Sequence, residues 1–236
     1  RNLFAIIPLV ALIFYTNENL KIFKKTTKKF IILCFIRGQC FLFMNFFYFI
    51  AINNMDFATA STLTFSATFF IVILSIFFLN DKVGIYRWSA VIIGFAGVAM
   101  IMKPTSDVFS YYSIYPVMVA LLYSIAIIIL KFIPKHNSTA KIQFYSLISS
   151  IIGAIVLWAI TFDTKFIQSY KDLLMLISIG ILGGSAGILF IYAYRLIEAS
   201  KLAVFEYLAI PSSFLLGWFF FDETPIDQLF PGVLAI

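Results

Sequence analysis

Two charged side chains lie well inside apolar stretches of this sequence and are the first candidates for chemistry. Arg37 lies within residues 29–52, KFIILCFIRGQCFLFMNFFYFIAI, and Glu206 lies within residues 202–221, LAVFEYLAIPSSFLLGWFFF. A charge in hydrocarbon costs several kcal/mol unless it faces a partner or water, so each one marks a candidate site. Helical rise places Arg37 about 12 Å from Lys29 and Glu206 about 8 Å from Lys201, which are similar depths if these lysines border one membrane face.

We therefore predict that Arg37 and Glu206 pair across a central cavity and separate when a charged or zwitterionic substrate binds. Breaking such a pair costs more than never having it, because one charge is left buried alone. The alternatives are a static structural pair, an Arg37 or Glu206 that reaches the headgroups, and a Glu206 that takes up a proton.

The helix that carries Arg37 has a polar stripe along one face. Successive residues of an α-helix are rotated by 100° about its axis. With this rotation, one sector about 100° wide contains Cys34, Arg37, Gly38, Phe41, Asn45 and Tyr48. A cation, an amide, a phenol and a ring together suit the wall of a wet cavity. We expect Asn45 and Tyr48 to contact substrate beside Arg37.

Two further stretches contain weaker candidates. Tyr194 shares a helical face with four glycines, residues 180, 183, 184 and 187, and this pattern favours close helix packing over a sliding surface. Pro211 precedes Ser213 and can kink its helix, which frees a carbonyl group toward a polar cavity. The predicted site includes both Tyr194 and Ser213.

The sequence predicts no cofactor, no bound metal and no catalytic residues. Cys34 and Cys40 lie six positions apart in one apolar span, and His136 has no second ligand near it in the sequence. The acidic residues are scattered along the turns, and there is no glycine-rich loop for ATP. A membrane-embedded enzyme and a primary pump are both disfavoured.

The composition indicates an all-α membrane protein. Hydrophobic residues make up 62% of the 236 positions and charged residues 12%, whereas a soluble domain has roughly 25% charge. The net charge of +6 reflects the lysines beside the spans and gives no reason to expect a nucleic-acid partner.

Continuous apolar runs of about 20 residues predict transmembrane helices, with the lipid bilayer as an obligatory partner. We predict spans at 2–16, 30–52, 57–79, 85–102, 111–133, 142–162, 173–194 and 202–221, and a remnant from 226. Most lysines and arginines fall in the turns at 17–29, 80–87, 131–141 and 195–201. These turns are therefore predicted to be cytoplasmic, including the lysine-rich ones at 17–29 and 131–141.

An internal repeat relates the two halves of the chain. A gapless shift of 142 positions places Gly38 on Gly180, Asp56 on Glu198, and Asp81 on Glu223. The matched acidic positions fall on opposite predicted sides, so the two copies are inverted. We predict residues 1–103 as the first repeat without its first helix and 104–236 as the second with a truncated last helix, within an intact arrangement of five plus five helices.

The sequence resembles the EamA-type transporters of the drug/metabolite transporter superfamily. The resemblance rests on AINNMDFATASTL, FFLNDKVGIYRWSAVIIGFAGVAMI and AYRLIEASKLAVFEYLAIPSSFLLGWFFFDETP. Asn80 and Asp81 stand where the family usually has Gly-Glu, and Phe69 stands where the second copy has Pro211. Tyr123 lies where the family often has an aromatic residue, which implies a place in the cavity wall.

This resemblance implies a secondary transporter that moves a small organic metabolite across the cytoplasmic (inner) membrane by alternating access. The expected substrate is amino-acid-like, zwitterionic or amphipathic. Coupling to a proton or another ion is left open, as is the choice between monomer and dimer. The alternatives are a multidrug or toxic-compound exporter with the same fold and a non-transporting membrane scaffold or enzyme.

Overall fold

The computed structural model describes residues 2–16, 26–55, 57–102, 110–161 and 169–212, with positions 215 and 219. Within these ranges the regular elements are α-helices and short 3-10 segments, and there is no strand. The chain is an all-α membrane protein, as the composition predicts.

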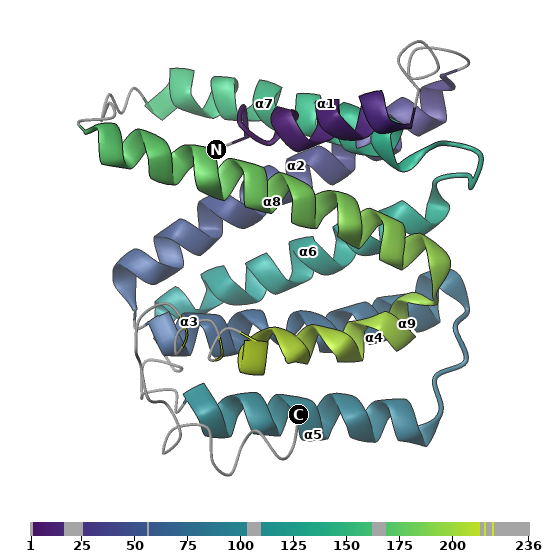
Figure 1. Cartoon of the computed structure of the whole chain (residues 1–236). Coiled ribbons are helices and arrows are strands. Elements are labelled where there is room, and N and C mark those ends of the chain that lie inside the picture. Colours follow the sequence, from purple (N-terminus) through teal and green to yellow (C-terminus); the bar gives the residue numbers. More distant parts are fainter. Residues whose placement is uncertain are drawn as a thin grey trace. The chain divides into compact units, whose positions relative to one another are not determined.

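The helices follow the predicted spans at 30–52, 85–102, 111–133, 142–162 and 173–194 closely. In chain order they are α1 (Ile6–Tyr15), α2 (Lys28–Asn54), α3 (Phe57–Thr64), α4 (Ala67–Leu79), α5 (Ile85–Met102), α6 (Ile114–Phe132), α7 (Thr139–Thr161), α8 (Tyr170–Leu196) and α9 (Ala199–Ala203). The α-helices are labelled in Figure 1. The 3-10 segment η2 (Tyr111–Ser113) precedes α6, and the 3-10 segment η3 (Val204–Leu208) follows α9. The predicted span at 202–221 begins with α9 and a 3-10 segment, and the predicted remnant from 226 lies outside the described residues.

Membrane-spanning length is reached in several of these segments. Five helical segments in the described ranges are long and apolar enough to cross a membrane: Lys28–Asn54, Thr59–Leu79, Tyr111–Phe132, Thr139–Ile160 and Tyr170–Leu196. Their length and composition, with roughly 20 apolar residues needed per span, make this a multi-pass membrane protein.

The predicted span at 57–79 is not one continuous helix. It breaks at Phe65 and Ser66, where Ser66 Oγ donates a hydrogen bond to the Leu63 carbonyl at 2.6 Å. Ser124 Oγ on α6 donates to the Ala67 carbonyl at 3.0 Å. The backbone groups at the break are hydrogen-bonded within the chain, since Ser66 N–H donates to the Leu63 carbonyl and Thr68 N–H to the Phe65 carbonyl. The Ser124 contact ties α6 to the first turn of α4.

The chain forms two compact units, and each draws on both halves of the sequence. Unit 1 comprises residues 1–42 and 129–196, and unit 2 comprises residues 43–128 and 197–236. Because the boundaries fall inside α2 and α6, these two helices each contribute to both units.

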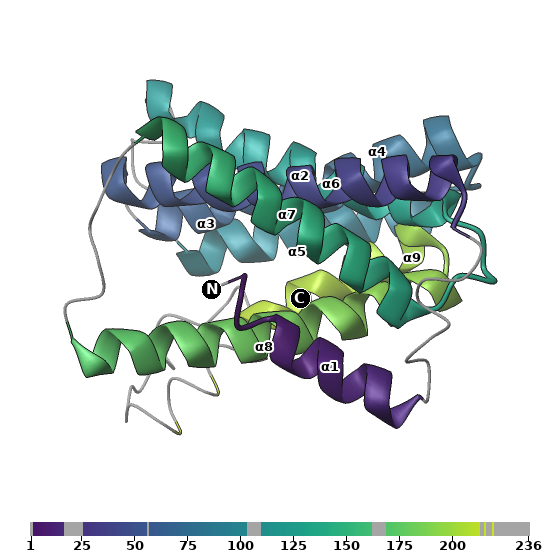
Figure 2. The same ribbon diagram turned by 90° about the horizontal axis from the view of Figure 1, so that it is seen from above.

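Unit 1 is built from α1, α7 and α8, which contact one another in pairs, and the neighbouring part of α2. Figure 2 shows α1 beside α8. Ala5, Leu9, Ala140 and Leu147 form an apolar core between α1 and α7. A methyl group on Gly184 would meet Ala5 within 3.0 Å, so the absence of a side chain there allows α8 to approach α1.

The first half of α2 packs on α7 through both polar and close backbone contacts. Gln39 Nε2 donates to the Ser149 carbonyl at 2.7 Å, and Ser149 Oγ donates to the Phe35 carbonyl at 2.8 Å. A Cβ atom on Gly38 would collide with the Ser146 carbonyl oxygen. These contacts hold the Arg37 region of α2 against α7.

Unit 2 contains α3, α4, α5, α9 and η3, with the remaining parts of α2 and α6. α9 packs on α4, and η3 packs on α5. Tyr207 on η3 is buried with Val98 and Ile210, and its hydroxyl donates to the Val91 carbonyl at 3.2 Å. A methyl group on Gly94 would collide with the Tyr207 ring, so α5 accommodates this ring because residue 94 is glycine.

Candidate functional site

A cavity with a volume of about 510 Å³ lies within unit 2. Its lining is mostly apolar surface with a few polar groups, and comprises Met44, Asn45, Tyr48, Ser61, Thr64, Phe65, Ala67, Val119, Tyr123, Glu206, Ala209 and Ile210. Small-molecule sites commonly have this character and enclose about 300–1,000 Å³. The cavity can therefore hold a small organic molecule.

The polar focus of this cavity is a hydrogen bond between α6 and η3. Tyr123 Oη donates to Glu206 Oε1 at 2.7 Å. A distance of 2.7 Å is usual for a well-formed O–H···O hydrogen bond, and this contact fixes the direction of the Glu206 side chain. Asn45 and Tyr48, one turn apart on α2, line the same space.

Neighbouring residues determine where these two side chains point. Tyr123 precedes Ser124, whose hydroxyl donates to the carbonyls of both Ala67 and Ala120 and so ties α6 to α4. Glu206 precedes Tyr207, whose buried ring and hydroxyl anchor η3 on α5. Tyr123 and Glu206 are therefore each adjacent in sequence to a packing anchor.

Irregular backbone borders the cavity on two sides. Phe65 and Ala67 come from the break between α3 and α4, and Glu206 comes from the 3-10 segment η3. Sequence reasoning missed both irregular segments as cavity walls. The hydroxyl residues Ser66 and Thr68 are a signal in the sequence for the break between α3 and α4. The apolar residues around them form a continuous run, which hides this signal.

A second, smaller cavity of about 110 Å³ lies within unit 1. Arg37 lines it and is only 2% exposed, so its guanidinium does not extend out of the protein. Arg37 Cζ lies 4.7 Å from the centre of the Phe41 ring, a cation–π contact. Asn2, Gln143, Ser146 and Ser150 add polar groups, and the glycine face of α8 closes one side.

The predicted site residues are thus divided between several places. Asn45, Tyr48, Tyr123 and Glu206 surround the unit 2 cavity, whereas Arg37 lines the unit 1 cavity. Their roles in binding, and the pairing of Arg37 with Glu206, stay predictions.

Tyr194 and Ser213 lie elsewhere or cannot be placed. Tyr194 is fully buried in unit 1, with its ring stacked on Phe190 at a centroid distance of 6.4 Å. This position agrees with the packing interpretation of the glycine face. Ser213 lies outside the described residues.

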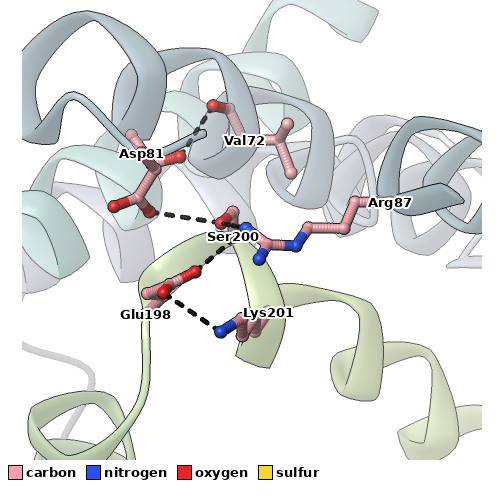
Figure 3. Close-up of polar contacts among 7 residues, drawn as sticks. Val72, Asp81, Arg87, Glu198, Ser200 and Lys201 are labelled. Atoms are coloured by element: carbon pink, nitrogen blue, oxygen red, sulfur yellow. Dashed lines mark hydrogen bonds and ion pairs between the residues drawn. The ribbon is translucent and has the colours of Figure 1, made fainter. Parts of the chain in front are cut away.

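A polar cluster in unit 2 joins the turn after α4 to the turn before α9 (Figure 3). The Glu198 carboxylate forms ion pairs with Arg87 Nη1 and Lys201 Nζ, each at 3.0 Å. Ser200 Oγ donates to Asp81 Oδ2 at 3.2 Å and accepts from Arg87 Nη1 at 3.0 Å. The hydrogen bond from Lys201, together with the charge of Arg87, lowers the pKa of the Glu198 carboxyl below its ordinary value.

Comparison with known proteins agrees with this architecture. The chain is 26% identical to the S-adenosylmethionine uptake transporter of Rickettsia felis over its whole length, covering 78% of that protein. It is 29% identical to the riboflavin transporter of Rhizobium johnstonii over 75% of this chain and 58% of that one. A solved crystal structure aligns with this chain at a TM-score of 0.65 and 16% sequence identity. The alignment covers 99% of this chain and 94% of the chain in that structure, and it supports the fold alone.

The sequence profile of the EamA-like transporter family matches residues 1–103 and 111–236, which is nearly the entire sequence. The chain belongs to the EamA-like transporter family.

Proposed function

We propose that this protein is a secondary transporter that moves a small organic metabolite across the cytoplasmic membrane, and that the unit 2 cavity binds its substrate. The observation that carries the proposal is the Tyr123–Glu206 hydrogen bond inside a mostly apolar space of about 510 Å³. The apolar wall accommodates the body of a metabolite, and the few polar groups orient its charged or polar end.

The rings around Glu206 favour a substrate with a positively charged group as part of an amphipathic or zwitterionic molecule. Tyr48, Phe65 and Tyr123 line the same cavity as this carboxylate. Aromatic faces attract organic cations, and a carboxylate supplies the opposite charge. Curated relatives named for S-adenosylmethionine uptake, riboflavin transport and pseudopaline export, the last from Pseudomonas aeruginosa, support a metabolite of this size.

Alternating access between inverted repeats is the proposed mechanism. Transporter sites of this kind are built from discontinuous helices near the repeat interface. The 142-residue shift places the α3–α4 break at Phe65 and Ser66 onto Tyr207 and Leu208 of η3. Both irregular segments border the cavity, which supports equivalent gating elements in the two repeats.

The test is transport by the full-length protein reconstituted in proteoliposomes. The panel contains S-adenosylmethionine, riboflavin and a zwitterionic amino acid, each measured in both directions and with and without a proton gradient. We expect saturable transport of one compound and a loss of about 10- to 150-fold in Glu206→Gln, because a hydrogen bond to a charged group contributes about 1.5–3 kcal/mol. Transport by Glu206→Gln at the wild-type rate at every pH would remove Glu206 from the mechanism.

Site-directed labelling distinguishes a transporter from a membrane scaffold or embedded enzyme. Cys34 and Cys40 are buried free thiols and are first replaced by serine. In that background Asn45→Cys and Ser213→Cys should react with an impermeant thiol reagent from alternate sides of the membrane as substrate is added. A scaffold leaves both unreactive or reactive from one fixed side. The same assay on Lys135→Cys checks the predicted cytoplasmic position of the turn at 131–141.

A further inference from the structure

The unit 1 cavity has the donor set of an anion site. Arg37 contributes a guanidinium that is 2% exposed, and the side chains of Gln143, Ser146 and Ser150 are each more than nine-tenths buried beside the same cavity. Among the residues that line it in the described ranges, none is acidic. An ion that enters this cavity meets a positive charge and neutral hydrogen-bond donors.

Two hydroxyl groups in this set can bond a further ligand. Ser150 Oγ accepts a hydrogen bond from Asn2 Nδ2 at 2.9 Å, which leaves its own proton to donate. Ser146 Oγ is buried beside the Cys34 thiol and makes no hydrogen bond to a nitrogen or oxygen atom in the described part of the chain. A thiol is a weak hydrogen-bond partner, so a ligand or water at this position gives the Ser146 hydroxyl a stronger one.

The surrounding charge also favours an anion. Lys141 on α7 is 5% exposed, and its Nζ lies over the Phe30 ring at 5.1 Å. Arg37 and Lys141 both lie within electrostatic range of Cys34 in the same unit. Arg37 lines the cavity, so its positive charge favours an anion there over a cation.

The size of the cavity restricts the class of anion. Its volume is about 110 Å³, and a water molecule takes up about 30 Å³ of liquid. A halide with one or two waters fits this space, whereas the metabolite proposed for unit 2 does not. Phe41 covers one face of the guanidinium, so the ion approaches its edge, where the N–H groups lie.

We propose that the unit 1 cavity beside Arg37 binds a small monovalent inorganic anion, with chloride as the ion to test. Arg37 supplies the charge, and Gln143, Ser146 and Ser150 supply hydrogen bonds. This site is separate in composition from the proposed metabolite cavity, which shares none of its lining residues. Its occupancy does not depend on the proposed transport function.

The test measures thermal unfolding of the purified full-length protein without substrate. Chloride is titrated against gluconate at constant ionic strength, since gluconate is too bulky for a cavity of this volume. We expect chloride to raise the unfolding midpoint saturably in the wild type. Arg37→Gln should abolish the dependence, whereas Arg87→Gln, which removes a cation from the unit 2 cluster, should retain it.

Ser146→Ala keeps the test decisive if Arg37→Gln does not fold. This change removes one hydroxyl and should weaken the apparent chloride affinity about tenfold or more, as expected for a hydrogen bond to a charged ligand. Its unfolding midpoint in gluconate should match that of the wild type. Equal midpoints of the wild type in chloride and gluconate, an intact chloride effect in Arg37→Gln, or an unaltered affinity in Ser146→Ala would each overturn the proposal.

Discussion

Replacing Tyr123 with phenylalanine tests whether the carboxylate in the unit 2 cavity must be held in place. The change removes only the hydroxyl that donates to Glu206 Oε1 at 2.7 Å and keeps the ring that lines the cavity. Glu206 retains its charge, so the variant separates the orientation of the carboxylate from its presence.

The expected loss of substrate affinity in Tyr123→Phe follows from the hydrogen bond between Tyr123 and Glu206. A hydrogen bond to a charged acceptor contributes about 1.5–3 kcal/mol, or about 10- to 150-fold in an equilibrium constant. The cavity of about 510 Å³ admits water, which replaces part of the lost bond. We therefore expect the lower end of this range, which is about a tenfold rise in KM for the substrate identified by the proteoliposome panel, with a smaller change in maximal rate.

The assay is initial-rate transport in proteoliposomes with Tyr115→Phe as the matched control. Tyr115 lies on the same helix, stacks on Tyr112 at a centroid distance of 6.3 Å, and is not among the cavity-lining residues. It should transport with the wild-type KM. A wild-type KM in Tyr123→Phe alongside impaired transport by Glu206→Gln would refute the orienting role of the phenol.

Three further predictions concern stability, each measured as thermal or denaturant unfolding of the purified protein. Gly38→Ala should destabilise unit 1 by on the order of 1–3 kcal/mol, because the new methyl group meets the backbone carbonyl of Ser146. The control Gly183→Ala should be neutral or stabilising, because its Cβ has nothing within 4 Å. Equal changes in stability in the two variants would contradict the predicted clash at Gly38. Ser149→Ala should cost about 0.6 kcal/mol, a usual value for a polar contact between membrane helices, and no change would show that its two hydrogen bonds are replaced on mutation. Glu198 has a lowered pKa, so its ion pairs should stabilise the protein above the ordinary carboxyl pKa of 4.5 and lose this effect as the pH falls through the folded-state pKa. The small difference in unfolding midpoint between the wild type and Glu198→Gln should then vanish at low pH. A difference that persists at low pH would exclude the charge of Glu198 as its cause.

Local sequence determined most of the helical fold. A membrane span depends on about 20 consecutive apolar residues, and this length is visible without knowledge of neighbours. The predicted segment 85–102 coincides with α5, and the predicted segment 30–52 lies within α2. The charges in apolar runs were also visible, because a charged residue inside a span, such as Arg37 or Glu206, is rare enough to stand out.

Tertiary structure decided which of these residues share a cavity. Asn45, Tyr123 and Glu206 are far apart in the sequence, and only the packing of α2, α6 and η3 places them around one space. Ser124 of α6 contacts the Ala67 carbonyl just after the helix break, a contact that the local pattern at 57–79 cannot reveal. The sequence alone therefore determined most of the spans and the rare charges within them. Contacts between distant segments decided where those charges lie, because a side chain's surroundings depend on the helices that pack against its own.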